Sequence, residues 1–203
     1  AIHFFSWHLP IYALPTGEEV VAGSATFEHS NDGSTLNITA QDQSIIQYSS
    51  FNIAPLETVN FYLPSSDASL LNRILGGSMS DILGTLTSNG RIILINESGF
   101  YFGPTALVDV GSLIASTHNL SNSNFLAGNN TFASLDRSIE SAGASILNEG
   151  VIRTAEGGHA VLIADAIENR GTIKAPLGTI ALAGGNQVTV GIGKPSGAFP
   201  LGQ

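Results

Sequence analysis

Histidines and carboxylates are the side chains of this 203-residue chain that could bind a metal ion or transfer a proton. The five histidines are spread along the sequence at His3, His8, His29, His118 and His159. None has metal-ligand spacing to another histidine or a carboxylate. The carboxylates do not form the tight DxD or DD clusters that a polysaccharide lyase or glycosidase would use. We therefore expect no metal site and no cofactor, and we expect the carboxylates to lie on the solvated surface.

The charge balance argues against nucleic acid as a partner. The chain has 16 acidic and 7 basic residues, which gives a formal net charge of -9, whereas binding to a phosphate backbone needs clustered Lys and Arg. There is no cysteine, so disulfide scaffolds, thiolate zinc sites and Cys nucleophiles are excluded together.

A polar tetrad interrupts the apolar stretch RIILINESGFYFGP (91–104). It consists of Asn96, Glu97, Ser98 and Gly99, which is a pattern that suits a type I turn because Asn is favoured at its first position and Gly at its fourth. We expect a turn between two buried strands, with Phe100 beginning the second strand. The aromatic run from Phe100 either alternates between core and surface or forms an exposed patch for a partner.

Four asparagines lie in N-x-[ST] acceptor sequences, namely Asn37, Asn96, Asn119 and Asn129. Glycosylation at these positions is formally open. Asn is so common in this chain that the matches can also arise by chance.

An internal repeat occupies the C-terminal third, where residues 146–164 align with residues 167–185 at a constant offset of 21. The alignment superposes Asn148 on Asn169, Gly150 on Gly171, and Val161 on Leu182. A period near 20 with short β-prone runs, Gly and Asn indicates a solenoid. The L-x-x-L-x-L frame of leucine-rich repeats is missing, so a parallel β-helix fits better.

In a β-helix, equivalent residues of successive coils stack at about 4.8 Å. We expect Asn148 and Asn169 to form a side-chain amide ladder at a corner, in the left-handed backbone conformation that a bend can require. Gly150 and Gly171 would supply the permissive backbone. A structural role is therefore the favoured interpretation of these residues.

Short strand-like runs recur between turn residues, and helical periodicity is weak. The predicted strands are residues 35–39, 44–48, 58–63, 91–95 and 187–192. The best helical candidates are SDASLLNRILGG (66–77), with Gly76-Gly77 as its end, and SMSDILGTL (78–86). Alternatively, these segments form an irregular insertion or a hairpin across the coils.

Several stretches together resemble a known family: LPTGEEVVAGSATF (14–27), FNIAPLETVNFYLP (51–64), LLNRILGGSMSDILGTLTSNGRIILINESGFYFGP (70–104), ALVDVGSLIAST (106–117) and NFLAGNNTF (124–132). The chain resembles the N-terminal secretion domain of two-partner-secretion exoproteins, the filamentous-haemagglutinin or haemolysin-like group of Gram-negative bacteria. The resemblance covers roughly residues 14–192 in order.

This resemblance implies an all-β fold, a right-handed parallel β-helix with an N-terminal cap and extra-helical β elements. It implies a monomeric, non-enzymatic domain that the POTRA domains of an outer-membrane transporter recognise, and that nucleates folding of an adhesin, haemolysin or contact-dependent toxin outside the cell. The missing passenger would contact a host or neighbouring cell. Residues 1–13 would be a signal-peptide remnant or a cap segment, 14–192 the secretion domain, and 193–203 a tail leading to the passenger.

The family's central motif is usually Asn-Pro-Asn-Gly followed by Ile, whereas this chain has Asn96-Glu97-Ser98-Gly99-Phe100. The turn chemistry survives the change, but Glu97 adds a charge. The tetrad therefore serves either the bend alone or also a transporter contact. The alternative function is a carbohydrate-binding or carbohydrate-cleaving β-helix, which would require a groove lined with several carboxylates and aromatics.

Overall fold

The structure, a computed structural model, describes residues 13–134 and 144–191. The expectations for residues 1–13 and 193–203 lie outside the described residues, apart from Ala13. The strands are β1 (Glu19–Ala22), β2 (Ala25–His29), β3 (Thr35–Ala40), β4 (Ser44–Tyr48), β5 (Thr58–Tyr62), β6 (Ser69–Ile74), β7 (Ser80–Ile82), β8 (Thr85–Asn96), β9 (Phe100–Phe102), β10 (Leu107–Ser116), β11 (Thr131–Ala133), β12 (Ser145–Asn148), β13 (Val151–Thr154), β14 (His159–Ile163), β15 (Ala166–Asn169), β16 (Thr172–Lys174), β17 (Thr179–Ala183) and β18 (Gln187–Thr189). Among the described residues, the single helix is α1 (Asn122–Leu126).

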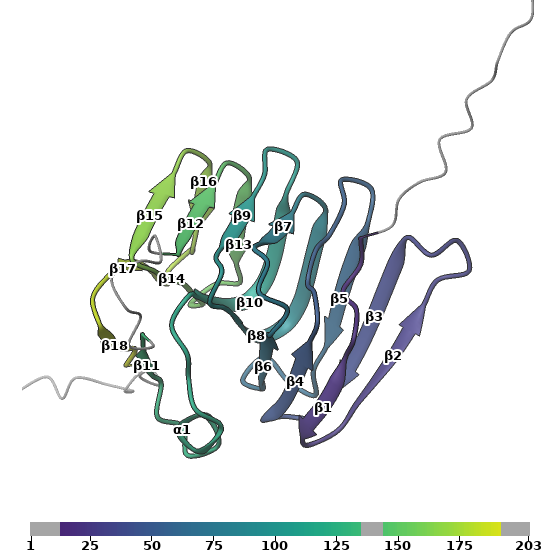
Figure 1. Ribbon diagram of the computed structural model, residues 1–203, viewed down its shortest axis with the longest axis horizontal. Helices are drawn as coiled ribbons and strands as arrows, with labels where there is room; N and C mark the ends of the chain where they lie inside the picture. Colours follow the sequence, from purple (N-terminus) through teal and green to yellow (C-terminus); the bar gives the residue numbers. More distant parts are fainter. Residues whose placement is uncertain (1–12, 135–143, 192–203) are drawn as a thin grey trace, which may run out of the picture.

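The strands wind into a β-solenoid of about six turns with three faces (Figure 1). The first face contains β3, β5, the start of β8, the start of β10, β13 and β16, all paired in parallel. The second face contains β4, β6, the end of β8, the end of β10, β14 and β17. The third face contains β7, β9, β12 and β15. The first corner joins the first and second faces, the second corner joins the second and third faces, and the third corner leads back to the first face.

The core is a set of apolar columns inside the coils. On the first face one such column runs through six coils: Leu36, Val59, Leu86, Val108, Ile152 and Ile173. Because side chains alternate across a strand, every second residue joins such a column. Each fully buried Leu or Ile stabilises the fold by about 1.5–3 kcal/mol. The repeated alternation of apolar and polar residues therefore fixes the register of the coils.

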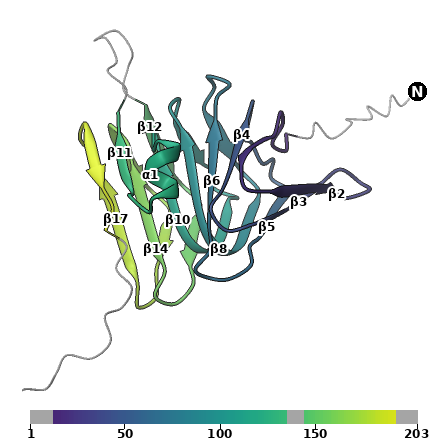
Figure 2. The same cartoon turned by 90° about the horizontal axis from the view of Figure 1, so that it is seen from below.

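The N-terminal end of the solenoid is capped by antiparallel strands. β2 pairs with β3, and β1 pairs with β4, so the first coil is not the end of the sheet. An outer strap, residues 117–134, leaves the coils after β10 and carries α1 and β11, and β11 pairs antiparallel with β18. Figure 2 shows α1 on the outside of the coils. The predicted all-β parallel β-helix with a cap and extra-helical β elements is confirmed.

Strands replace both predicted helices, and the strand in the first of them is buried on both sides. Residues 66–77 contain strand β6 and residues 78–86 contain strand β7 and the start of β8. Leu70 joins the interior core, whereas Leu71 joins a second cluster under the strap. A strand buried on both sides reads as a continuous apolar run, which sequence periodicity does not separate from a helix. The alternatives of a hairpin or an irregular insertion across the coils are also wrong.

The 21-residue offset holds only for the first part of the repeat. Asn148 lies beside Asn169 at that offset, but Val161 pairs with Ala181 and Leu162 with Leu182, an offset of 20. The superposition of Val161 on Leu182 is therefore wrong. Val161 faces the strap and Leu162 faces the interior. A one-residue slip would turn the side chains of β17 to the opposite face. The turn before β17 is one residue shorter than the turn before β14, and Leu182 therefore remains in the interior column.

Among the described residues, no helix is long and apolar enough to cross a membrane.

Candidate functional site

The tetrad forms a hydrogen-bonded turn at the second corner, between β8 and β9. Asn96 is 1% exposed. Its Nδ2 donates to the Ser78 carbonyl and to Ser80 Oγ, both at 2.9 Å, and its Oδ1 accepts from the Ser98 backbone N–H at 2.9 Å. The backbone N–H of Gly99 donates to the Asn96 carbonyl at 3.0 Å. Asn96 thus holds its own turn and the turn of the preceding coil together.

Gly99 is required by this turn in two ways. Its φ is +107°, and a Cβ atom on it would lie 2.5 Å from the Ser145 carbonyl oxygen of the next coil. A side chain here would therefore strain the backbone and separate two coils. Glu97 and Ser98 are half-buried, so they are the residues of the turn that present side chains outward.

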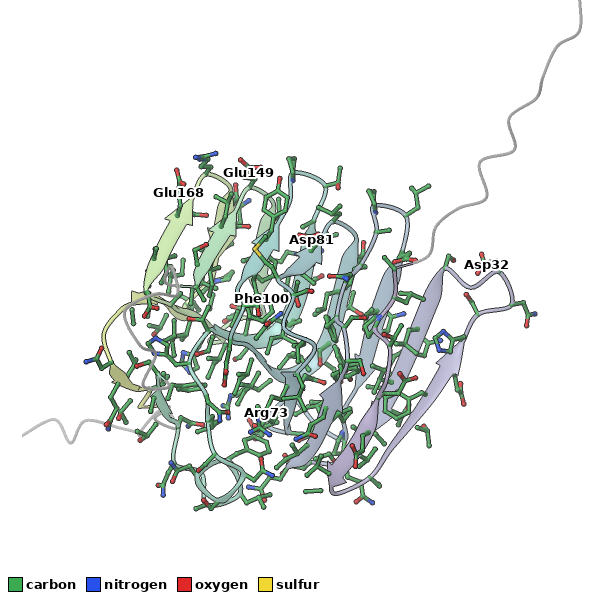
Figure 3. All side chains as sticks on the ribbon, in the orientation of Figure 1. Asp32, Arg73, Asp81, Phe100, Glu149 and Glu168 are labelled. Atoms are coloured by element: carbon green, nitrogen blue, oxygen red, sulfur yellow. The ribbon has the colours of Figure 1, made fainter. Side chains whose placement is uncertain are left out.

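Glu97 also acts electrostatically on Arg73, a residue that the sequence patterns did not indicate. The guanidinium of Arg73 donates from Nε to Asn119 Oδ1 at 3.1 Å, from Nη1 to Asn122 Oδ1 at 2.9 Å, and from Nη2 to the Leu120 carbonyl at 2.6 Å. It thereby ties β6 to the outer strap (Figure 3). Burial lowers the pKa of Arg73, and the negative charge of Glu97 opposes that shift. The available sequence signal was a charged residue within the otherwise buried run of β6, directly before Ile74.

The aromatic run after the turn alternates between core and surface. Phe100 and Phe102 are fully buried and stack with ring centroids 6.0 Å apart, whereas Tyr101 is half-buried and faces outward. Its hydroxyl donates to Glu149 Oε2 at 2.7 Å. That hydrogen bond raises the pKa of Tyr101 and lowers the pKa of Glu149. An exposed patch of all three aromatics does not form.

Asn148 and Asn169 lie at the third corner in consecutive coils. Nδ2 of Asn148 donates to Oδ1 of Asn169 at 2.7 Å, and Oδ1 of Asn148 accepts from the backbone N–H of Gly150 at 3.2 Å. The Asn148 carbonyl also accepts from the N–H of Gly171 at 2.9 Å. Asn148 is fully buried, whereas Asn169 is exposed.

The expected left-handed backbone at this corner is wrong. Neither the two asparagines nor Gly150 and Gly171 have a positive φ. Glycine is needed there because the coils approach closely. A Cβ on Gly150 would lie 2.6 Å from the Gly103 carbonyl oxygen, and a Cβ on Gly171 would lie 2.2 Å from the Gly150 carbonyl oxygen.

The predicted residues thus occupy two separate corners. Asn96 to Phe100 lie at the second corner, and the Asn148–Asn169 ladder lies at the third. Neither corner contributes a residue to the hollow that lies beside the N-terminal cap. Their shared feature is one buried asparagine at each corner, Asn96 or Asn148, whose side chain satisfies backbone groups of its own turn or of a neighbouring coil.

A second polar contact at the base of the strap also escaped sequence reasoning. His118 is 2% exposed, and its Nε2 lies 3.3 Å from Asp165 Oδ1. The two residues are 47 positions apart in the sequence, so only the stacking of coils brings them together. No local spacing pattern could have paired them.

The described residues contain no group of three or more His, Cys, Asp or Glu that could hold a metal ion. A hollow of about 370 Å³ lies beside the N-terminal cap. Its lining residues are Ser24, Ala25, Thr26, Thr39, Ala40, Gln41, Tyr62, Leu63 and Pro64. This lining contains one aromatic residue and no carboxylate.

A β-solenoid with one capped end, an outer strap and corners held by buried asparagines defines a structural module of the parallel β-helix type. Comparison with known proteins gives the family: residues 11–202 match the model of the TPS secretion domain, and the chain belongs to that family. Such domains are recognised by an outer-membrane transporter. The chain is accordingly part of a two-partner-secretion exoprotein exported by a Gram-negative bacterium, consistent with a secreted or cell-surface location.

Two kinds of relative support this assignment. The crystal structure of the HMW1 secretion domain from Haemophilus influenzae matches with a TM-score of 0.82 and 32% identity, over 86% of this chain and 46% of that one. A heme/hemopexin-binding protein of Haemophilus influenzae is 32% identical over 107 residues, and that of strain Rd is 34% identical over 108 residues. Each of these two heme/hemopexin-binding matches covers 53% of this chain and 12% of the longer relative.

Proposed function

We propose that this domain docks on the periplasmic POTRA domains of its transporter and then nucleates β-helix folding of a passenger outside the cell. The observation that carries this proposal is the difference between the two ends of the solenoid. The N-terminal end is covered by β1 and β2. In the described part of the chain, no strand pairs with the outer edges of β16 and β17.

The open end has the chemistry of a template. Ile180 and Leu182 stack on the buried residues Ala160 and Leu162, yet they are 48% and 51% exposed. A further coil would bury them and would pair the free backbone groups of β17. In a solenoid each repeat is stabilised by its neighbours, so a completed coil lowers the cost of ordering the next one.

The second corner is our candidate for the docking surface. The turn before β7 and the tetrad turn lie in adjacent coils, because Ile74 pairs with Asn96 and Ser80 pairs with Phe100. Leu75 and Met79 are 58% and 45% exposed in the first of these turns. Exposed apolar side chains beside the carboxylate of Glu97 give a mixed surface of the kind found at protein interfaces.

The test of docking is an export assay. Residues 14–203, preceded by a signal peptide, are fused to an inert reporter and expressed with or without the cognate transporter. We expect the reporter in the medium only when the transporter is present. Export without the transporter would refute the proposal. Leu75→Ser with Met79→Ser should reduce export, whereas Tyr62→Ser, an exposed residue on the first face, is the matched control.

The passenger is proposed to be an adhesin, haemolysin or contact-dependent toxin that engages a host or neighbouring cell. Because the chain spans only 12% of the heme/hemopexin-binding relatives, their named ligand is not transferred to it. We propose a monomer, which sedimentation velocity would test. The hollow beside the cap does not support the carbohydrate alternative, because its lining lacks the carboxylates that this alternative requires.

A further inference from the structure

Two separate anchors hold the strap against the coils. Near its start, three groups of the strap accept hydrogen bonds from the guanidinium of Arg73 on β6. Near its end, β11 pairs antiparallel with β18, which lies beside it in Figure 1. β6 precedes the strap in the chain, whereas β18 follows it. The two halves of the strap therefore depend on coils that are formed by early and by late parts of the sequence.

The second anchor extends beyond the two paired strands. The backbone N–H of Ser134 donates to the Asn186 carbonyl at 2.9 Å, and the backbone N–H of Val190 donates to the Asn130 carbonyl at 2.9 Å. Residues 186–190 thus supply the hydrogen-bonding partners along one edge of β11. Without these residues the backbone groups on that edge would have to bind water instead.

The buried side chain of β11 depends on the same late residues. Phe132 is fully buried and pairs with Val188. It belongs to the apolar cluster under the strap together with Val161 and Ile163 of β14, and Val188 and Val190 pack against this cluster. Burial of a large apolar side chain is a main source of stability. For Phe132 this stabilisation is complete only when β14 and β18 are both in place.

We propose that β18 is the latch of the strap, and that the half with β11 closes over the second face only after residues 186–190 have folded. The half bound to Arg73 closes earlier, because its partner coils are already present. Thr131 of β11 and Thr189 of β18 are 58 positions apart in the sequence. Closing a loop of that length costs conformational entropy, which the contact between the two strands has to offset. Pairing of β11 is therefore a late step in folding.

This order leaves an apolar surface open until the solenoid is complete. Val161 and Ile163 are buried on the outer side of β14, under the closed strap. A chain is synthesised from its N-terminus, so these residues are present before β18 is. A domain without a folded β18 therefore exposes hydrophobic side chains that the complete domain buries. Transporter docking plays no part in this closure.

Hydrogen exchange of the full chain, followed by mass spectrometry, tests the latch at equilibrium. Val188→Asp places a carboxylate against the cluster under the strap. We expect it to accelerate exchange in residues 130–134 by about tenfold or more, while residues 122–128 exchange as in the unmodified protein. Gln187→Asp is the matched control, because it adds the same charge on the exposed side of the same strand.

Three outcomes of this exchange experiment would overturn the proposal. One is unchanged exchange of residues 130–134 in Val188→Asp, and another is equal acceleration by the control. The third is acceleration by Val188→Asp that extends to residues 122–128, since that half is bound to Arg73 and does not need the latch.

Pulsed hydrogen exchange during refolding from urea tests the order of closure in the unmodified chain, so it remains decisive if Val188→Asp does not fold. We expect β8, β10 and residues 122–128 to gain protection before residues 130–134, and β11 to gain protection together with β18. A dye that fluoresces on exposed apolar surface should lose its signal in the same late step. Protection of β11 before β18, or of the whole strap in one step with the coils, would refute the late closure.

Discussion

Asn148 and Asn169 join two consecutive coils through a hydrogen bond of 2.7 Å between their side chains. Their environments are unequal, because Asn148 is fully buried and Asn169 is exposed. The buried member also binds the Gly150 N–H. The ladder is therefore anchored from the inside, and its two members should contribute unequally to stability.

The first prediction follows from this inequality. Asn148→Ala should lower the free energy of unfolding by about 2–3 kcal/mol, because it leaves the buried backbone N–H of Gly150 without its acceptor and breaks the bond to Asn169. Asn169→Ala should cost only about 0.5–1 kcal/mol, because water can replace its carbonyl. Urea unfolding followed by circular dichroism measures both values. Equal losses would contradict the proposed anchoring.

Two glycines should respond to alanine for different reasons. Gly171→Ala introduces a Cβ 2.2 Å from the Gly150 carbonyl oxygen, so we expect a loss of about 2–3 kcal/mol from forced separation of the coils. Gly77→Ala meets no atom within 4 Å but has a φ of +74°. It should cost about 1–2 kcal/mol through backbone strain alone. A larger loss at Gly77 would show that close approach is not the main constraint.

Leu177 is a position where substitution should stabilise the fold. Its φ is +51°, and its side chain is 85% exposed. The turn has the same hydrogen bond as the turn one coil earlier, where Gly157 has a φ of +75°. Leu177→Gly should raise the free energy of unfolding by about 0.5–1 kcal/mol, since relief of strain exceeds the added entropy of the unfolded chain. Leu177→Ala is the control and should be nearly neutral. A lower midpoint in urea for Leu177→Gly would refute this prediction.

Substitutions in the tetrad can separate a purely structural role of this turn from a direct contact with the transporter. Replacing Glu97-Ser98 with Pro-Asn should gain about 0.4–1 kcal/mol from a less flexible unfolded chain, but it also removes the charge that faces Arg73. Glu97→Gln measures that second effect separately and should reduce stability more at low salt than at high salt. Export by the transporter is assayed in parallel. Greater stability with unchanged export would mark the tetrad as purely structural, whereas reduced export would support a direct contact.

Asp32 makes the hairpin between β2 and β3 sensitive to acid. Hydrogen bonds from the Ser30 hydroxyl, followed by those from Ser34, lower the pKa of Asp32 from 3.8 to about 2. Because the folded pKa lies below the unfolded one, the contribution to stability is present above about pH 3.8 and is lost as the pH falls toward 2. NMR titration of the Asp32 carboxyl measures the value. Ser30→Ala should move the pKa upward, and an unchanged pKa would contradict the assigned cause.

Much of the fold could be predicted from local patterns. The alternating segments at residues 35–39 and 44–48 correspond to β3 and β4, and the 21-residue repeat correctly places Asn148 beside Asn169. Prediction failed where a strand is buried by residues that lie far away in the sequence. The pattern of β6 predicts a helix because the strap covers the outer side of this strand and makes it apolar on both sides. The turn before β17 is one residue shorter than its counterpart in the preceding coil, and the local repeat does not indicate this because it depends on which face of the strand is buried.

The site shows the same division. The sequence identified the turn at Asn96, because turn chemistry depends on a few adjacent residues. It did not identify the contacts of Arg73 with Asn119 and Asn122, which are 46 and 49 positions away. Those contacts exist only after the strap has folded back over the coils.

The sequence by itself determined that this chain is a β-solenoid, since period, turn residues and alternation are written locally, and its resemblance to the secretion-domain family implied the cap. Only the tertiary structure decided why its corner glycines are needed and how the strap is held. These properties depend on the distance between stacked coils and on side chains far apart in the chain. Local periodicity contains no information about either.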